Sequence, residues 1–468
     1  MKLSFHGAAR TVTGSKHIVH IGAEKKLLLD CGMFQGMGKD TLRLNSEWGF
    51  EPSELTHVII SHAHVDHIGL LPKLVKDGYH GKIFCTVASE PLIRVLLLDS
   101  AKIQQDDVRY HSRHVATESN PSQGPLYTEA DAMEVFPMLI PIDYNVDYEI
   151  EKGINLRYTD AGHILGSAVV NLTLEEDGKI VRLCFSGDVG RYGDTILSSP
   201  EVFPQADFII MESTYGDRLH HLTTVAYDKI LHQIQHTCIE KKGKLIIPAF
   251  SLGRTQELLY ILNRFELENR LPPVHYYVDS PLSLQITEIT KQFPQCFNKH
   301  VRKQLEADED VFDFKGLKTI KSAEQSISLN TTPEPCVIIS ASGMAEAGRV
   351  KHHIKHAISN ARNTILFSGY CEPHSLGGRI RSGARQVRIY GELFDVNAEI
   401  DALESLSAHG DYEDLSQWLA CQDKQQVRKL FLVHGEYETQ LNFKDRLIRK
   451  GFTDIAIPAQ HEVIGLGV

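Results

Sequence analysis

Short apolar runs rich in β-branched residues recur along the chain and predict a mixed α/β protein. The first three runs, at residues 2–7, 17–21 and 25–30, are separated by glycine and polar turns, which is typical of antiparallel strands. A fourth run at 55–60 precedes apolar residues at helical spacing, and a longer helical pattern covers 89–115. We therefore expect the opening part of the chain to combine strands with covering helices.

The second half of the chain has a different pattern, in which buried strands alternate with helices that begin near residues 255 and 349. Such alternation favours a parallel sheet. The predicted strands lie at 244–250, 275–279, 336–340, 364–367 and 386–390. We interpret this region as a second α/β domain, inserted before the first domain resumes, with the charged stretch 305–325 as an irregular excursion from it.

Length and composition favour a soluble protein with two domains. A chain of 468 residues is long for one domain, and it contains no apolar run of the roughly 20 residues that span a bilayer. No signal peptide is visible at its start, and eight cysteines without a Cys-x-x-Cys pair are typical of reduced thiols. We expect a cytoplasmic protein without membrane contact. The formal net charge of −11 gives no overall attraction to nucleic acid, so any phosphate-binding surface must be local.

The main chemical signal is a cluster of three histidines and one aspartate on the loop that follows the strand at 55–60: His62, His64, Asp66 and His67. Loops from a strand end to a helix are where α/β proteins place their sites. Imidazole and carboxylate together suit zinc, manganese or iron. The first two histidines can point at one ion and the following Asp-His pair at a neighbouring one, which indicates two metals. A His-rich surface loop or a lone structural ion is the alternative.

Other acids and histidines stand at the ends of later strands. Asp30 closes the third strand, and His163, Asp188 and Glu212 end three more. Singly, each is as readily a turn residue as a ligand. Together with the cluster at 62–67, His163 supplies a third histidine for one ion, and Asp188 supplies a carboxylate able to bridge two.

The order of these residues resembles the successive motifs of the metallo-β-lactamase fold, an αββα sandwich with a metal site at one edge of its two sheets. Three later motifs, at Glu212, 407–411 and 433–436, resemble those of the β-CASP group of metallo-β-lactamase nucleases. The resemblance runs nearly from end to end of the chain. It implies a metallo-β-lactamase domain in two parts, 1–216 and 397–468, with an inserted parallel α/β β-CASP domain at 217–396.

The resemblance also implies a dinuclear centre that holds two Zn²⁺, with Mn²⁺ as the alternative. By motif position, it assigns His62, His64 and His163 to one ion and Asp66, His67 and His434 to the other, with Asp188 bridging. A hydroxide shared by the two ions would attack phosphorus and leave 5′-phosphate and 3′-hydroxyl ends. His409 is expected to act as the general acid, oriented by Glu212, while Asp30 positions a ligand or the hydroxide.

Two strand-to-helix junctions in the predicted inserted domain combine small residues, hydroxyls and an arginine. Exposed amides at helix N-termini bind phosphate, and arginine adds a bidentate contact. The residues predicted to bind substrate phosphate are Ser251, Arg254, Ser340, Ser342, Gly343 and Arg349. Ordinary tight βα turns are the alternative.

The resemblance points to a nuclease that acts on single-stranded RNA. We expect the inserted domain to form a cleft with the metal edge that admits a strand and excludes bulky duplex. The chain ends soon after His434, as in compact bacterial and archaeal members of the group, which favours an endonuclease. A DNA nuclease of the same group and a non-catalytic RNA-binding scaffold subunit are the alternatives, and a homodimer is expected from the resemblance alone.

Overall fold

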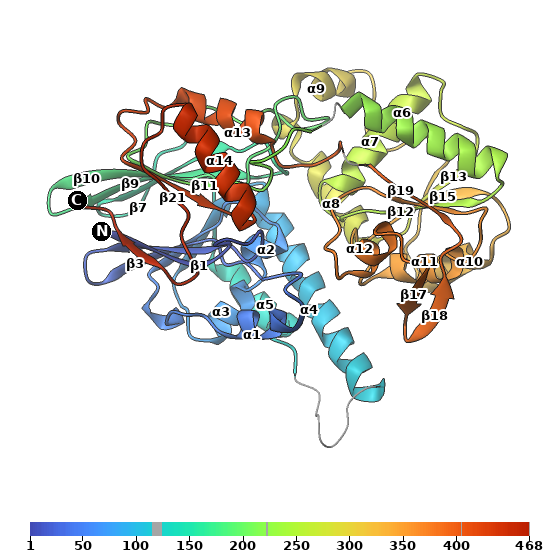
Figure 1. Cartoon of the computed structure of the whole chain (residues 1–468), viewed down its shortest axis with the longest axis horizontal. Helices are drawn as coiled ribbons and strands as arrows, with labels where there is room; N and C mark the ends of the chain where they lie inside the picture. Colours follow the sequence, from blue (N-terminus) through green and yellow to red (C-terminus); the bar gives the residue numbers. More distant parts are fainter. Residues whose placement is uncertain (115–123, 221–222, 404, 468) are drawn as a thin grey trace. The chain divides into compact units, whose positions relative to one another are not determined.

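The computed structural model describes residues 1–114, 124–220, 223–403 and 405–467. The chain divides into two compact units (Figure 1). The first unit comprises Met1–Leu219 and His409–Val468, and the second comprises His220–Ala408. Within the described residues, no helix has both the length and the apolar character that crossing a bilayer requires.

The first unit contains two seven-stranded sheets, each built from both ends of the unit's sequence. The order in one sheet is β22 (Val463–Gly465), β1 (Lys2–Gly7), β2 (Lys16–Ile21), β3 (Lys25–Leu29), β4 (His57–Ile59), β5 (Lys82–Thr86) and β6 (Leu139–Ile142). The order in the other is β21 (Ile455–Ala456), β20 (Lys429–Val433), β11 (Phe208–Glu212), β10 (Lys179–Phe185), β9 (Ala168–Glu176), β8 (Ile154–Asp160) and β7 (Tyr148–Glu151).

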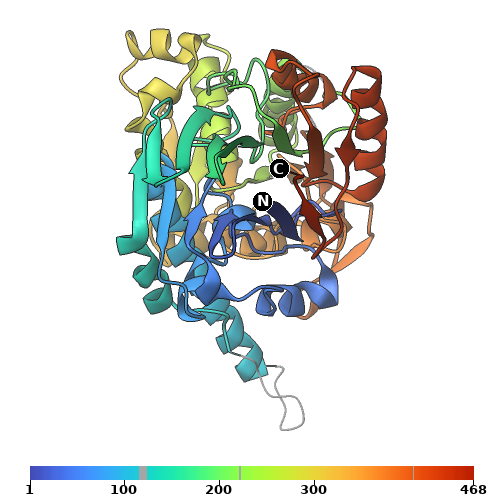
Figure 2. The same cartoon turned by 90° about the vertical axis from the view of Figure 1, so that its left-hand side faces the viewer.

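The two sheets of the first unit pack face to face and are covered by helices on their outer sides (Figures 1 and 2). Apolar residues from both inner faces, including Phe5, Phe185 and Phe431, form the core between them. Helices α13 (Tyr412–Trp418) and α14 (Tyr437–Arg449) pack Trp418 and Phe443 against the sheet that contains β20. The helices on the other side are α1 (Thr41–Ser46), α2 (Val65–Ile68), α3 (Leu71–Lys76), α4 (Ser89–His114) and α5 (Glu129–Val135).

This arrangement confirms the predicted αββα sandwich, and most predicted strands lie within a few residues of their observed bounds. The two ends of the chain meet because β22 pairs with β1 (Figure 2). The helical pattern after residue 67 is divided into α2 and α3, because Pro72 can stand only in the first turn of a helix.

The second unit is built on one six-stranded sheet in which every pairing is parallel, as the alternation of strands and helices predicts. Its strand order is β14 (Leu317–Thr319), β13 (His275–Val278), β15 (Cys336–Ser340), β12 (Lys244–Pro248), β16 (Thr364–Phe367) and β19 (Glu399–Ala402). The helices are α6 (Thr223–Ile234), α7 (Arg254–Leu267), α8 (Pro281–Lys291), α9 (Lys299–Leu305), α10 (Ala323–Thr331), α11 (Arg349–Ala357) and α12 (Leu376–Arg381).

Three details of the second unit differ from the sequence prediction. The run at 386–390 does not join the main sheet but forms the antiparallel hairpin β17 (Gln386–Ile389) and β18 (Glu392–Asp395). The stretch 305–325 is not wholly irregular, since β14 within it is an edge strand of the sheet. The unit also extends to Ala408 and includes β19, which the prediction assigns to the returning first domain.

Candidate metal centre and active site

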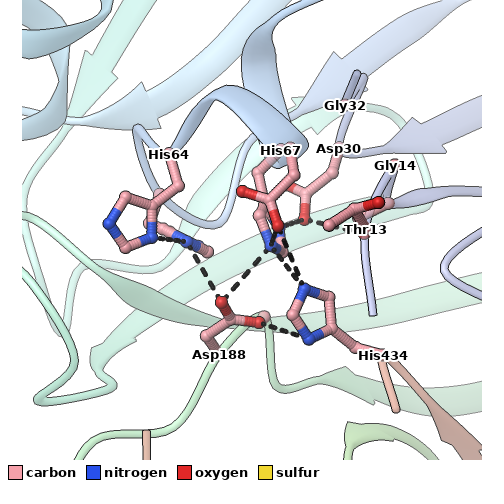
Figure 3. A network of polar contacts seen from close by, with 12 residues as sticks. Thr13, Gly14, Asp30, Gly32, His64, His67, Asp188 and His434 are labelled. Carbon is pink, nitrogen blue, oxygen red and sulfur yellow. Dashed lines mark hydrogen bonds and ion pairs between the residues drawn. The ribbon is translucent and has the colours of Figure 1, made fainter. Parts of the chain in front are cut away.

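The predicted site residues of the first unit converge on one edge of the sandwich. Asp30 follows β3, the loop that carries His62 and His64 follows β4, and His434 follows β20. β20 belongs to the other sheet, as do β8 and β10, and His163 and Asp188 lie just beyond these last two strands. Strand ends of both sheets therefore supply the side chains, which brings together residues far apart in sequence (Figure 3).

One group of potential ligands comprises His62, His64, His163 and Asp188, whose ligand atoms all lie within 4.8 Å of one another. His64 Nδ1 lies 3.1 Å from His62 Nε2 and 3.2 Å from His163 Nε2. Two nitrogens bound to one zinc at the usual bond length and tetrahedral angle lie about 3.3 Å apart. The spacing of the three rings therefore fits one tetrahedral ion.

A second group comprises Asp66, His67 and His434. His67 Nε2 and His434 Nε2 are 3.2 Å apart, and Asp66 Oδ2 lies 3.4 Å from His434 Nε2. Asp188 Oδ2 lies 3.4 Å from both His62 Nε2 and His67 Nε2, so one carboxylate oxygen reaches both groups. Figure 3 shows dashed contacts that join Asp188 to the rings of His67 and His434.

The nitrogen and oxygen atoms of the two groups are arranged to bind divalent cations rather than to form hydrogen bonds with one another. Asp188 is buried, and its Oδ1 has no hydrogen-bond partner among the described residues. The pKa values of His62 and His64 fall to about 3 and about 4, first because burial disfavours the charged ring. Neutral imidazoles and an ionised carboxylate are the forms that bind zinc. The residues present therefore fit two metal ions that share Asp188.

Asp30 and His67 form a closely bonded pair beneath the second group. Burial alone would lower the pKa of His67, but the carboxylates of Asp188, Asp30 and Asp66 outweigh it and raise the pKa well above 6.5. The His67 Nδ1 atom lies 2.6 Å from Asp30 Oδ2, so this bond turns Nε2 toward the ligand group. A bound cation at Nε2 would replace the proton that these carboxylates favour.

His409 and Glu212 form a separate pair beside the ligand groups. His409 Nδ1 lies 3.1 and 3.2 Å from the two Glu212 oxygens, and Glu212 also accepts a hydrogen bond of 2.7 Å from the Val189 amide. The His409 side chain is 20% exposed, whereas that of Asp188 is 2% exposed. Burial would lower the pKa of His409, but Glu212 and Asp188 raise it to about 9. The raised pKa favours a protonated His409 ring at neutral pH, and this ring is more exposed than Asp188.

Close packing and backbone strain accompany the site. Asp30 and His434 have φ values of 59° and 48°, a region that non-glycine residues adopt at a cost of about 1–3 kcal/mol. At Gly32, an added Cβ would lie 1.6 Å from the Asp66 carbonyl oxygen, so only glycine lets this loop pass behind the ligand helix. The surrounding fold therefore holds the ligands in place rather than leaving them on a loose loop.

Asp188, Glu212, His409 and His434 also lie within 4.8 Å of one another through their ligand atoms. Geometry alone therefore permits Glu212 and His409 to be metal ligands as well as an acid pair. The two assignments predict different metal contents for a His409 variant.

The residues predicted to bind phosphate lie in the second unit, on two neighbouring loops. Parallel pairing of β12 and β15 brings residues 251–254 and 340–343 to the same edge of the sheet. Both arginines already have carboxylate partners, because Arg254 pairs with Glu257, and Arg349 Nη1 lies 2.6 Å from Asp279 Oδ1. Their role toward substrate remains a prediction.

Two hydroxyl residues of the site were not predicted from the sequence. Ser61 contacts Asp30 and His62, and Thr214 contacts His434. Ser61 directly precedes His62, and Thr214 follows Glu212 by two positions. This closeness to predicted site residues was the sequence feature that could have indicated them. Serine and threonine are so common at strand ends that position alone did not distinguish them.

Two potential ligand groups that share one aspartate, at the strand ends of an αββα sandwich, form an arrangement suited to metal-dependent hydrolysis. Comparison with known families agrees in all three parts of the chain. Residues 17–220 match the metallo-β-lactamase superfamily, 255–380 the Beta-Casp domain and 394–458 the Zn-dependent metallo-hydrolase RNA specificity domain.

Individual relatives extend over nearly the whole chain. A ribonuclease of Thermus thermophilus is 33% identical over 451 residues, which cover 96% of this chain and 97% of the relative. An RNase J-like protein of Methanocaldococcus jannaschii is 28% identical, with 94% of each chain covered. Cleavage and polyadenylation specificity factor 73 of Drosophila melanogaster is 29% identical over 91% of this chain and 58% of its own length. The chain belongs to the β-CASP group of metallo-β-lactamase-fold nucleases.

Proposed function

We propose that this protein is a ribonuclease that cleaves single-stranded RNA internally, with two Zn²⁺ ions, or Mn²⁺ in their place, at the shared site. The observation that carries the proposal is that Asp188 Oδ2 lies 3.4 Å from a histidine of each ligand group, beside a separate pair, His409 and Glu212. The ribonuclease among the relatives and the match to an RNA specificity domain support RNA as the substrate.

The ligand assignment follows the two groups of donors. His62, His64 and His163 would hold one ion, Asp66, His67 and His434 the other, and Asp188 would bridge them. When bound, such ions supply a nucleophile by lowering the pKa of water and offset negative charge on the phosphate. The chain's contribution is to hold neutral imidazoles in place and to exclude water from the buried side.

His409 would donate the proton that the leaving group needs. As the bond between phosphorus and O3′ breaks, the departing oxygen takes a proton from the ring, so the products carry 5′-phosphate and 3′-hydroxyl ends. Because Nδ1 is bonded to Glu212, Nε2 is the nitrogen that would deliver the proton. Glu212 itself is fully buried and fixed by the Val189 amide, so it can orient the ring throughout the reaction.

Asp30 is proposed to act through His67 rather than on the substrate. It is fully buried and bonded to His67 Nδ1. Phosphates away from the scissile bond are proposed to meet the predicted residues of the second unit: Ser251, Arg254, Ser340, Ser342, Gly343 and Arg349. A homodimer and a cytoplasmic location stay predictions.

The test is gel analysis of end-labelled single-stranded RNA and DNA of the same sequence, each incubated with zinc-loaded protein beside Asp188→Ala. Internal RNA cuts that are absent with the variant and with DNA would support the proposal. Equal or preferential cutting of DNA would move the assignment to a DNA nuclease of the same group. Full metal occupancy without any cutting would favour a non-catalytic RNA-binding scaffold.

A further inference from the structure

We propose that Ser61 and Thr214 are positioning residues that select the tautomers of His62 and His434, one hydroxyl for each ligand group. The inference rests on the metal centre of the proposed function but not on the identity of the substrate. The basis is which atom donates and which accepts in each hydrogen bond that the two hydroxyl groups form.

Ser61 lies at the point where the two sheets of the first unit meet. It is 1% exposed, its amide donates to Asp30 Oδ1 at 2.8 Å, and its carbonyl accepts from the Ala168 amide at 2.8 Å. At Gly187 an added Cβ would lie 2.5 Å from Ser61 Cβ, so the side chain is packed against glycine backbone. The hydroxyl therefore has one fixed position.

The proton of the Ser61 hydroxyl is committed to Asp30. Ser61 Oγ lies 2.9 Å from Asp30 Oδ2, and an ionised carboxylate can only accept. The same Ser61 Oγ lies 3.0 Å from His62 Nδ1. Because its proton is used on Asp30, Ser61 Oγ can only accept from the ring, so His62 carries its proton on Nδ1.

This tautomer leaves a lone pair on His62 Nε2, the atom that lies 3.1 Å from His64 Nδ1 and 3.4 Å from Asp188 Oδ2. His67 Nδ1 donates to the same Asp30 carboxylate at 2.6 Å, which turns His67 Nε2 toward the other ligand group. One chain of hydrogen bonds, from His62 through Ser61 and Asp30 to His67, thus sets the ligating nitrogen in both groups. Ser61 links a histidine of one group to a histidine of the other.

Thr214 does the same for the third histidine, independently of Asp30. Its Oγ1 lies 3.1 Å from the His434 carbonyl oxygen, to which it donates, and 3.0 Å from His434 Nδ1. With the hydroxyl proton used on the carbonyl, Oγ1 accepts from Nδ1–H, a nitrogen that Asp188 Oδ1 also approaches to 3.6 Å. The lone pair of His434 Nε2 then faces His67 Nε2 at 3.2 Å.

The experiment compares substitutions that remove a hydroxyl with matched ones that do not affect a tautomer. Ser61→Ala is paired with Ser15→Ala, because Ser15 Oγ donates to the same Asp30 Oδ2 at 3.2 Å but belongs to no contact with His62 in the described network. Thr214→Val, which keeps the side-chain shape, is paired with Thr214→Ser, which keeps the hydroxyl. Thermal unfolding of each metal-free protein reports whether the variant folds.

The first readout is the affinity for Zn²⁺ alone, measured by competition with a chelator. Loss of a partner that orients a ligand weakens metal binding by about 10–100-fold. We expect that loss for Ser61→Ala and Thr214→Val, and near wild-type affinity for Ser15→Ala and Thr214→Ser. Equal losses for Ser61→Ala and Ser15→Ala would overturn the role of Ser61, and equal losses for both Thr214 variants would overturn that of Thr214.

The second readout is the tautomer itself, observed by long-range ¹H–¹⁵N correlation in metal-free protein with ¹⁵N-labelled histidine. The signals of the two rings are identified by their absence from His62→Gln and His434→Gln. We expect Nδ1–H in the wild type and a shift toward Nε2–H in Ser61→Ala and Thr214→Val. Unchanged tautomers would refute the proposal even if zinc binding fell. Because neither readout involves RNA, the result is independent of whether the protein cleaves RNA.

Discussion

Two buried polar clusters, one in each unit, contain the same types of side chain. They differ in how many of their polar atoms find a hydrogen-bond partner or an opposite charge within the cluster. In the second unit, the fully buried Asp279 accepts hydrogen bonds from Ser326 Oγ at 2.5 Å, Arg349 Nη1 at 2.6 Å and His353 Nε2 at 2.7 Å. His353 Nδ1 in turn lies 2.8 Å from Asn330 Oδ1. The charge and the donors of this cluster are balanced within the protein.

The cluster of the first unit is not balanced in this way. Ring nitrogens of neighbouring histidines lie 3.1–3.2 Å apart, and Asp188 Oδ1 lacks a hydrogen-bond partner within the described parts of the chain. Burial of such groups is costly unless something pairs with them. A cluster whose polar groups all pair with one another stabilises a fold. A cluster in which the lone pairs of several side chains point to one place is suited to bind a cation.

The largest expected effect separates the two clusters directly. Asp188→Ala removes the carboxylate shared by both ligand groups, so we expect loss of both zinc ions and RNA cleavage at background level. Metal analysis of the purified variant and gel assays measure this. Asp279→Asn is the control and should retain its zinc, and a full zinc content in Asp188→Ala would contradict the bridging assignment.

The next effect concerns the acid pair. Removing a positioned proton donor slows an enzyme by about 10²–10⁴-fold, so His409→Ala should lose turnover by that factor while its zinc content stays at the wild-type value. Single-turnover cleavage and metal analysis of the same preparation test both parts. If the variant is stripped of zinc as thoroughly as Asp188→Ala, His409 is a ligand and not the acid.

A smaller effect, on the free energy of unfolding, is expected for the Asp279 cluster of the second unit. Asp279→Asn removes the charge that pairs with Arg349 and His353, and breaking a buried pair costs about 3 kcal/mol of the free energy of unfolding. Urea denaturation of metal-free protein at neutral pH measures it. A variant as stable as the wild type would show that this cluster contributes nothing net.

The same variant also makes a prediction about pH. Burial alone would raise the pKa of Asp279, but hydrogen bonds from His353, Ser326 and Arg349 outweigh it and lower the pKa from 3.8. A carboxyl with a depressed pKa in the folded state stabilises above its unfolded pKa and loses that contribution as the pH falls through the folded value. The stability difference between wild type and Asp279→Asn should therefore persist to about pH 4 and shrink below it.

The smallest effects should separate substrate contact from structure among the predicted phosphate-binding residues. Among the residues that the structure describes, Ser342 Oγ makes only a long contact of 3.4 Å to the Ala347 carbonyl, whereas Arg349 is paired with Asp279. We expect Ser342→Ala to weaken RNA binding a few-fold without a change in stability, and Arg349→Ala to lower both. Filter binding and urea denaturation distinguish them. An unchanged RNA affinity in both variants would remove these loops from the substrate site.

The fold was largely predictable because short apolar runs recur along the chain and ordered motifs accompany them. What the sequence concealed were short, half-polar elements such as β14 and β19, whose residues Leu317–Thr319 and Glu399–Ala402 form no apolar run and gain their strand state only by pairing with a buried neighbour. The hairpin at 386–395 was misplaced because a strand-like pattern does not reveal its partner.

Within the site, the spacing of residues 62–67 and the strand-end acids pointed to several of the side chains that the structure brings together, and the family resemblance added His409 and His434. The roles of Ser61 and Thr214 could not be predicted in this way. They depend on which atoms approach within about 3 Å across the fold, as when Ser61 meets Asp30 from 31 positions away. Hydrogen-bond direction is a property of that geometry and not of the local sequence.

The chain positions of the ligands have a consequence for how the centre forms during synthesis. The group of His62, His64, His163 and Asp188 is complete before the second unit is translated, whereas Asp66 meets His434 from 368 positions away. A ribosome makes the chain from its N-terminus, so the group that needs His434 cannot close until the second unit has been made. A nascent chain thus carries an incomplete centre until its whole second unit has been translated.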